Sequence, residues 1–177
     1  MSASTDISLK DIAKHVDEER LWSRLMELGQ IGATSNEGVC RLALTDEEIK
    51  ARQLLIEWAQ EMSLSVYTDE ISNLFFRYEG IQNEKAPVVT GSHIDSQPTG
   101  GKFDGAFGVV AGFEAIKAMQ DAGFIPQVPL EIAVWLNEEG SRFSPGMMGS
   151  EAFTSRRPME QILAVEDAEG VKTADAL

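Results

Sequence analysis

The amino-acid sequence predicts an α/β fold of three layers, in which helices cover both faces of a mostly parallel central sheet. Two short apolar runs, Pro87–Gly91 and Leu130–Leu136, have the composition of buried strands, and a helical segment separates them. A strand, a helix and a second strand in this order form a βαβ unit, whose strands run parallel and whose crossover is right-handed. With 177 residues, the chain is long enough for one domain with its own core.

The segment before this unit is expected to form two helices and two strands. Apolar residues recur on one helical face through residues 7–28, at Ile12, Val16, Leu21, Leu25 and Leu28, and Gly29 should end that helix. Thr45 and Glu48 have the spacing of a capping box, which predicts a second helix running to about Met62. Leu64–Thr68 and Asn73–Tyr78 then have the composition of two strands joined by a turn.

The βαβ unit and the segment after it are assigned in the same way. The run Pro87–Gly91 is read as a strand buried on both faces, and Ala106–Ala122 as a helix that Gly123 closes. Beyond Leu130–Leu136, we expect short helices over residues 150–154 and 158–163, and a further helix that starts near Thr173.

Composition excludes several classes of function. A formal net charge of −14 argues against binding to nucleic acid or to an anionic membrane surface, because both need Lys and Arg. No apolar run approaches the ~18 residues that span a membrane, and Met1–Lys10 lacks the pattern of a signal peptide. Cys40 is the only cysteine, so no intrachain disulfide can form. These features predict a cytoplasmic protein.

Two motifs follow the two predicted strands of the βαβ unit. Residues 91–105 read G-S-H-I-D-S-Q-P-T-G-G-K-F-D-G and contain His93, Asp95 and Asp104. Residues 137–143 read N-E-E-G-S-R-F and contain Glu138 and Glu139. In open α/β sheets, ligands bind outside the carboxyl ends of the strands, and both motifs fall there. One imidazole with several carboxylates makes an oxygen-rich site that suits two divalent metals, with zinc, manganese, cobalt and nickel as candidates.

Each of these side chains can be given a role. His93 would bind one metal through a ring nitrogen, and Asp95 would orient that ring by accepting its other N–H. Asp104, in a glycine-rich turn, is the candidate for a carboxylate that bridges both metals. Glu139 is assigned as a metal ligand and Glu138 as the general base that takes a proton from water. Either motif alone is weak, since an isolated H-x-D or E-E is more often structural or solvated.

The sequence also resembles a known family in four segments, residues 21–29, 91–109, 135–143 and 147–150. They resemble the zinc-dependent amidohydrolases of the M20 metallopeptidase superfamily, and specifically its hydantoinase/carbamoylase branch. The short interval between His93 and Asp104 is typical of that branch. The resemblance implies a two-metal site with His93 and Glu139 as terminal ligands on different metals and Asp104 between them.

The resemblance also implies that residues 1–177 are the N-terminal part of a zinc-exopeptidase-like catalytic domain. Family members add an inserted dimerisation domain, the C-terminal part of the catalytic domain and two further metal-binding histidines, and the full-length relatives form homodimers. The implied reaction is hydrolysis of a linear, non-peptide C–N bond, with an N-carbamoyl-L-amino acid yielding amino acid, ammonia and carbon dioxide. Allantoate amidohydrolase and β-ureidopropionase activities remain alternatives. A different class is a catalytically inactive remnant that acts as an interaction module.

Overall fold

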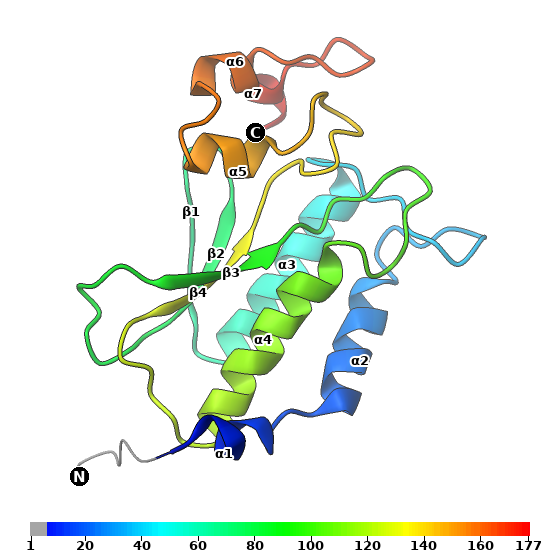
Figure 1. The fold of residues 1–177 in the computed structure, drawn as a ribbon. Helices are drawn as coiled ribbons and strands as arrows, with labels where there is room; N and C mark the ends of the chain where they lie inside the picture. Colours follow the sequence, from blue (N-terminus) through cyan, green and yellow to red (C-terminus); the bar gives the residue numbers. More distant parts are fainter. Residues whose placement is uncertain (1–6) are drawn as a thin grey trace.

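A computed structural model describes residues 7–177, in which seven helices and four strands form one α/β unit (Figure 1). The expectation that the chain has no signal peptide concerns Met1–Lys10 and so falls largely outside the described residues. Along the chain the elements are α1 (Leu9–Ala13), α2 (Glu18–Leu28), α3 (Asp46–Glu61), β1 (Ser65–Thr68), β2 (Leu74–Tyr78), β3 (Val88–Ser92), α4 (Ala106–Asp121), β4 (Leu130–Val134), α5 (Met148–Phe153), α6 (Met159–Leu163) and α7 (Thr173–Ala176). No helix within 7–177 has the length and apolar character needed to cross a membrane.

The four strands form a mixed sheet in the order β1-β2-β4-β3. Strands β3 and β4 run parallel and are joined by α4, so the predicted βαβ unit is confirmed. The other two pairings, β1 with β2 and β2 with β4, are antiparallel. The α/β class is therefore confirmed, but in the described residues the sheet is mixed rather than mostly parallel, because the hairpin β1–β2 adds to the far side of β4.

One face of the sheet carries the main core. Phe76 of β2, Ile132 of β4 and Phe113 of α4 have no more than 1% of their surface exposed. The ring of Phe113 lies 4.9 Å from that of Phe76 and 5.9 Å from that of Trp58 on α3, so α3 and α4 cover the same face. Figure 1 shows α2 beside α4 on that side of the sheet. The apolar periodicity of these helices is accounted for by this packing.

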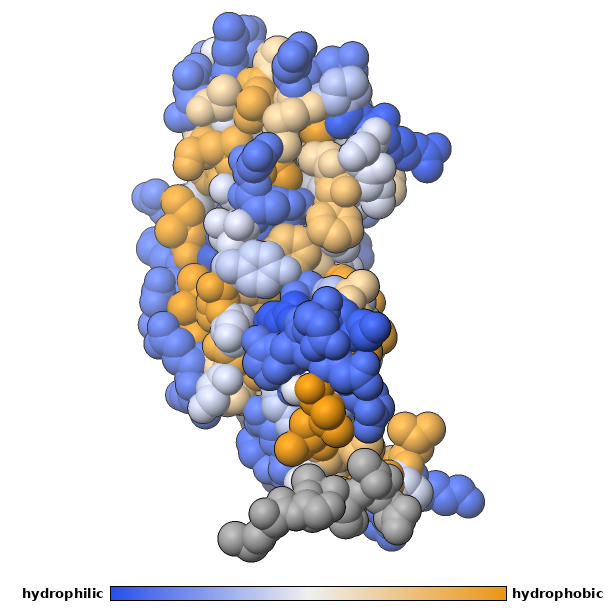
Figure 2. Space-filling model, turned by 90° about the vertical axis from the view of Figure 1, so that its left-hand side faces the viewer, coloured by the Kyte–Doolittle hydropathy of each residue, from blue (hydrophilic) through white to orange (hydrophobic). Residues whose placement is uncertain are grey.

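The opposite face, called here the open face, is covered only in part. It carries an aromatic cluster in which Tyr67 stacks on Phe75 at 5.0 Å, and Phe75 meets Trp135 edge-on at 5.9 Å. Phe153 of α5 packs on both Phe75 and Trp135. Figure 2 views the molecule from the left of Figure 1 and shows apolar side chains exposed among polar ones. In the described residues, the predicted third layer is thus reduced to the contact that α5 makes.

Strand β3 lies at an edge of the sheet, where it pairs with β4 alone. Val88 has 57% of its surface exposed and Val89 has 38%. The prediction that Pro87–Gly91 is buried on both faces is therefore wrong within the described residues. Its short apolar sequence is that of a strand, but apolar composition does not distinguish a central strand from an uncharged edge.

The prediction of one helix over residues 7–28 is also wrong, because two helices share that range. Asp17 starts α2, since its carboxylate accepts the backbone N–H groups of Glu19 and Arg20, both at 3.0 Å. Such an N-cap residue has an extended backbone, which interrupts the helix before it. Because the apolar spacing continues across the break, the sequence pattern did not reveal it.

The helix predicted from Thr45 forms as α3, but the capping box does not. The Thr45 hydroxyl donates to the carbonyl of Leu42 at 2.7 Å and leaves the helix N-terminus without a side-chain cap. Glu48 is buried and pairs with Arg52, and its other carboxylate oxygen accepts the N–H of Leu44 at 3.4 Å. The predicted positions of the two strands that follow and of the short helices near 150, 158 and 173 are confirmed.

Candidate active site

The two acidic motifs meet where the strands β3 and β4 end, at their carboxyl ends. Strands β3 and β4 are parallel, so their carboxyl ends lie together, and the N–H of Trp135 donates to the carbonyl of Ser92 at 2.8 Å. His93 follows directly after β3, and Glu138 comes four residues after the end of β4. The fold therefore places both motifs where the rule for open α/β sheets predicts a ligand site.

His93 lies at the centre of the candidate site, with 5% of its surface exposed. Its Nδ1 atom lies 2.9 Å from the backbone carbonyl oxygen of Asp95, and its Nε2 atom lies 3.3 Å from Oε2 of Glu138. Burial by itself lowers the pKa of His93, but the hydrogen bonding and charge of Asp95 and the charge of Glu138 outweigh it and raise the pKa to about 9. The two neighbouring carboxylates thus favour the protonated imidazole over the neutral one.

Asp95 connects the two motifs. One oxygen of its carboxylate accepts the backbone N–H of Glu138 and the other accepts that of Glu139, both at 3.2 Å. The same carboxylate lies 3.5 Å from Nδ1 of His93. The sequence predicted that this carboxylate accepts the ring N–H, but the nearer partner of Nδ1 is the backbone carbonyl of Asp95. The hydrogen bonds from the carboxylate to the backbone of the glutamate pair were not predicted. Asp95 therefore fixes the distance between the imidazole and the glutamates.

The turn that carries the glutamates has an unusual backbone. Asn137 and Gly140 both adopt positive φ, 48° and 66°, and the Asn137 side chain donates to the carbonyl of Phe143 at 2.7 Å. This turn sends neighbouring side chains in different directions. Glu138 points at His93, while Glu139 accepts a hydrogen bond from the side-chain amide of Gln97 at 3.0 Å.

Asp104 lies in the loop before α4, directly before Gly105, which packs against the His93 ring. Its side chain is exposed, and its backbone carbonyl accepts the N–H of Ala106 at 2.6 Å. Within the described residues, its carboxylate makes no hydrogen bond or ion pair to the other site residues. The structure thus brings His93, Asp95 and Glu138 together, with Asp104 and Glu139 at the periphery.

The donor chemistry of these residues fits a divalent metal, because it offers one imidazole nitrogen and three carboxylates that are not used to hold the backbone. Nε2 of His93 faces the carboxylate of Glu138, the residue assigned as the general base. In residues 7–177, however, no group of three or more His, Cys, Asp or Glu side chains has the spacing of a metal site.

Arg41 is a supporting residue that sequence reasoning missed. Only 2% of its surface is exposed, and its guanidinium donates to three carbonyls, those of Ile94 at 2.6 Å, Ile31 at 2.8 Å and Leu28 at 3.1 Å. Burial lowers its pKa to about 10, although the charges of Glu48 and Asp95 oppose this. Arg41 also exchanges hydrogen bonds with Ser96, so it holds both sides of Asp95. No motif distinguishes it from a surface arginine.

Arg142, in the turn after the glutamate pair, makes contacts that are structural. It pairs with Asp167 at 3.1 Å and donates to the carbonyls of Ala43 and Leu44 at 3.0 and 2.7 Å. It therefore joins the loop before α3, the turn after Glu138–Glu139 and the C-terminal segment.

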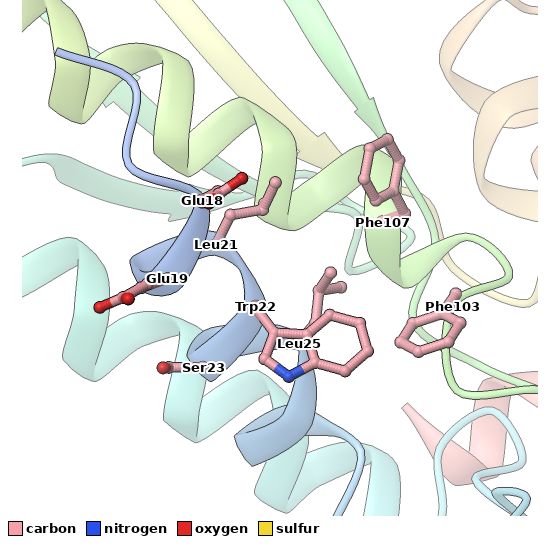
Figure 3. Close-up of a pocket in the computed structure, with 8 residues that line it drawn as sticks. All are labelled: Glu18, Glu19, Leu21, Trp22, Ser23, Leu25, Phe103 and Phe107. Carbon is pink, nitrogen blue, oxygen red and sulfur yellow. The ribbon is translucent and has the colours of Figure 1, made fainter.

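An apolar groove of about 810 Å³ lies beside α2, here called the α2 groove. Trp22 and Leu25 line it from α2, Phe103 from the loop before α4, and Phe107 from the first turn of α4 (Figure 3). The rings of Trp22 and Phe103 are 5.7 Å apart. Glu18 and Glu19 form its acidic border. Because Phe103 precedes Asp104, the groove adjoins the loop of the candidate site.

Comparisons with known proteins agree with this arrangement. The sequence profile of peptidase family M28 matches residues 73–176, and that family is a relative of the M20-type zinc peptidases that the motifs resemble. A crystal structure of a hydantoinase/carbamoylase family amidase from Burkholderia ambifaria has a TM-score of 0.90 and 46% identity, over 92% of this chain and 40% of that one. The resemblance stated from the motifs is therefore confirmed.

Two curated relatives differ in the activity that their names state. An N-carbamoyl-L-amino acid amidohydrolase of Geobacillus stearothermophilus is 43% identical over 162 residues, which are 92% of this chain and 39% of the relative. A ureidoglycolate hydrolase of Arabidopsis thaliana is 31% identical, over 91% of this chain and 34% of the relative. The chain thus spans 39% and 34% of the length of these two relatives.

Proposed function

This chain belongs to peptidase family M28, and on that premise we propose that the protein is a metal-dependent amidohydrolase acting on linear C–N bonds outside peptides. The observation that carries the proposal is the contact between Nε2 of His93 and the carboxylate of Glu138. This contact joins the two motifs at the carboxyl ends of β3 and β4. The names of the relatives, all hydrolases of carbamoyl or ureido compounds where a substrate is given, support the same reaction class.

The proposed substrate is an N-carbamoyl-L-amino acid, which water would cleave to the amino acid, ammonia and carbon dioxide. The relatives with this name reach 43% identity, against 31% for the ureidoglycolate hydrolases, and this difference favours the carbamoyl compound. A ureido acid such as allantoate, or a β-ureido acid, is the second candidate. The cytoplasm is the proposed location, since the single Cys40 offers no partner for an intrachain disulfide.

In this proposal, His93, Asp104 and Glu139 would hold two divalent metals, with zinc first and manganese, cobalt or nickel as alternatives. When bound, such metals supply a water of lowered pKa and polarise the carbonyl oxygen. Glu138 would act as the general base that takes a proton from water and returns it to the leaving nitrogen. Asp95 would hold the imidazole and the glutamates in fixed relative positions through its hydrogen bonds to the backbone of Glu138 and Glu139.

The test measures bound metal by mass spectrometry and ammonia release from N-carbamoyl amino acids, on the same purified chain. Glu138→Gln should abolish ammonia release and leave metal binding, whereas Glu139→Gln should reduce both. Glu169→Gln, at an exposed position away from the site, is the matched control and should change neither.

No bound metal and no ammonia from carbamoyl or ureido substrates, with any of the four metals supplied, would reject the proposal for this chain. That outcome would favour the other reading, in which the chain is a catalytically inactive interaction module. Ammonia from a ureido acid alone would keep the reaction class and replace the substrate.

A further inference from the structure

The two adjacent glutamates share a backbone anchor but differ in the partners of their side chains. The carboxylate of Asp95 accepts the backbone N–H of Glu138 and that of Glu139, both at 3.2 Å. Oε2 of Glu138 lies 3.3 Å from Nε2 of His93. Oε2 of Glu139 instead accepts a hydrogen bond from the side-chain amide of Gln97 at 3.0 Å. The backbone hydrogen bonds therefore do not distinguish the two glutamates, whereas the side-chain contacts do.

Gln97 reaches Glu139 from a well-held stretch of backbone. Its carbonyl oxygen accepts the N–H of Gly100 at 3.1 Å, and the hydroxyl of the buried Ser96 lies 2.9 Å from the same oxygen. The residue before a proline is restricted to extended conformations, and Pro98 follows Gln97. The Gln97 side chain is exposed, and among the described residues its one hydrogen bond goes to Glu139.

An amide is a suitable donor beside a carboxylate that binds a cation. It donates a hydrogen bond without carrying charge, so it leaves the negative charge of Glu139 in place. A lysine or arginine at position 97 would neutralise that charge and repel a metal. The amide also occupies only Oε2, and within residues 7–177 the other carboxylate oxygen of Glu139 has no hydrogen bond. One oxygen is thus held while the other is left for a ligand.

We propose that Gln97 is a positioning residue for the metal ligand Glu139. Its amide fixes the direction of that carboxylate, so that Glu139 is presented to a metal while Glu138 alone contacts His93. This inference rests on the proposed function, which assigns the two glutamates their different roles. Partners that orient a ligating carboxylate typically contribute about 10–100-fold to metal affinity, because they limit the freedom that the side chain loses on binding.

The test is the affinity of the complete chain for Zn²⁺, measured without substrate by competition with a chromophoric chelator. Gln97→Met removes the donor and keeps a side chain of similar length, and it should weaken zinc binding by about 10–100-fold. Gln127→Met is the matched control. Gln127 is an exposed glutamine that precedes β4, whereas Glu139 follows it, so this variant should bind zinc as tightly as the wild type.

A second measurement separates positioning from a general loss of structure. If Gln97 acts through Glu139, the two residues should not have independent effects. Glu139→Gln weakens binding, and the addition of Gln97→Met to it should produce no further loss. In the metal-free protein, the side-chain amide resonance of Gln97 in NMR spectra should move in Glu139→Gln and move far less in Glu138→Gln.

The outcomes distinguish this inference from the proposed function. A wild type that binds zinc, with a Gln97→Met variant that binds it equally tightly, would overturn the role of Gln97 and leave the proposed function intact. Losses that multiply in the double variant would also overturn it, because Gln97 would then act by another route. A wild type that binds no zinc would reject both. Circular dichroism shows whether each variant is folded.

Discussion

Gly105 lies so close to His93 that no other residue fits in its place. A β-carbon at position 105 would be 2.5 Å from Cδ2 and Cε1 of the imidazole, and the backbone there has a φ of +64°. The start of α4 therefore depends on a residue without a side chain, and the position of the ring depends on the start of α4.

Gly105→Ala should destabilise the protein and displace His93. The left-handed backbone alone costs about 1–2 kcal/mol for a residue with a β-carbon, and the overlap with the ring adds to this. Urea unfolding measures the loss. Gly101→Ala is the control, because a β-carbon at Gly101 meets no atom within 4 Å, and it should change the free energy of unfolding by less than about 0.5 kcal/mol. Equal effects of the two variants would contradict the packing described for Gly105.

Asp95→Asn should loosen the turn that carries the glutamates. The amide keeps one acceptor oxygen but turns an N–H₂ group toward a backbone N–H, so one of the two 3.2 Å hydrogen bonds is lost. A buried donor left without its partner costs about 1–3 kcal/mol. Amide hydrogen exchange should become faster at Glu138 or Glu139. Asp175→Asn, at an exposed position in α7, should leave that exchange unchanged; unchanged exchange in Asp95→Asn itself would disprove the role of Asp95.

Arg41→Met should lower the free energy of unfolding by about 3 kcal/mol or more, because three carbonyls lose a charged donor in a buried place. Arg41→Lys should recover part of that loss, since an ammonium group still donates but lacks the fork geometry. Urea unfolding compares both variants with Arg156→Met, which changes an exposed arginine and should be nearly neutral. A neutral Arg41→Met would mean that water replaces the guanidinium.

Both tyrosines should ionise above the ordinary pKa near 10. Burial raises the pKa of Tyr78, and burial with a hydrogen bond to Glu131 raises that of Tyr67 to about 12. Between pH 10 and 12 the folded protein keeps a proton that the unfolded chain releases, so stability falls as the pH rises through this range. Ultraviolet titration of tyrosinate follows both groups.

The tyrosinate transition near pH 12 should disappear in Tyr67→Phe. In denaturant the two tyrosines should titrate together near pH 10. Titration of Tyr67 near pH 10 in the folded wild type would show that the open face is wetter than its aromatic packing indicates.

Local pattern was sufficient to predict most of the elements and the meeting of His93 with Glu138. The alternation of apolar strands and helices identified the βαβ unit, and the rule about strand ends then located the site. The break at Asp17 was missed because the apolar spacing continues across it. The position of β3 at an edge was missed because strand order depends on long-range pairing, which no local pattern in Val88–Ser92 records.

The hydrogen-bond partners of two site residues, Asp95 and Arg41, could not be predicted from the sequence either. A carboxylate two residues after a histidine was expected to serve that ring, but Asp95 binds the backbone of a turn more than forty residues away along the chain. Arg41 was missed for the same reason, since its partners are carbonyl groups and leave no trace in residue type. Backbone partners of side chains are decided by the folded path of the chain.

The three tryptophans occupy three different environments, and this gives the chain an internal set of optical reporters. Trp58 is buried against Phe113, Trp22 is 55% exposed in the α2 groove, and Trp135 borders a pocket beside Gly91. Their emission should separate into a blue, a red and an intermediate component, each assignable by one Trp→Phe replacement. Fluorescence can thus follow the core, the groove and the strand edge separately, without any added dye.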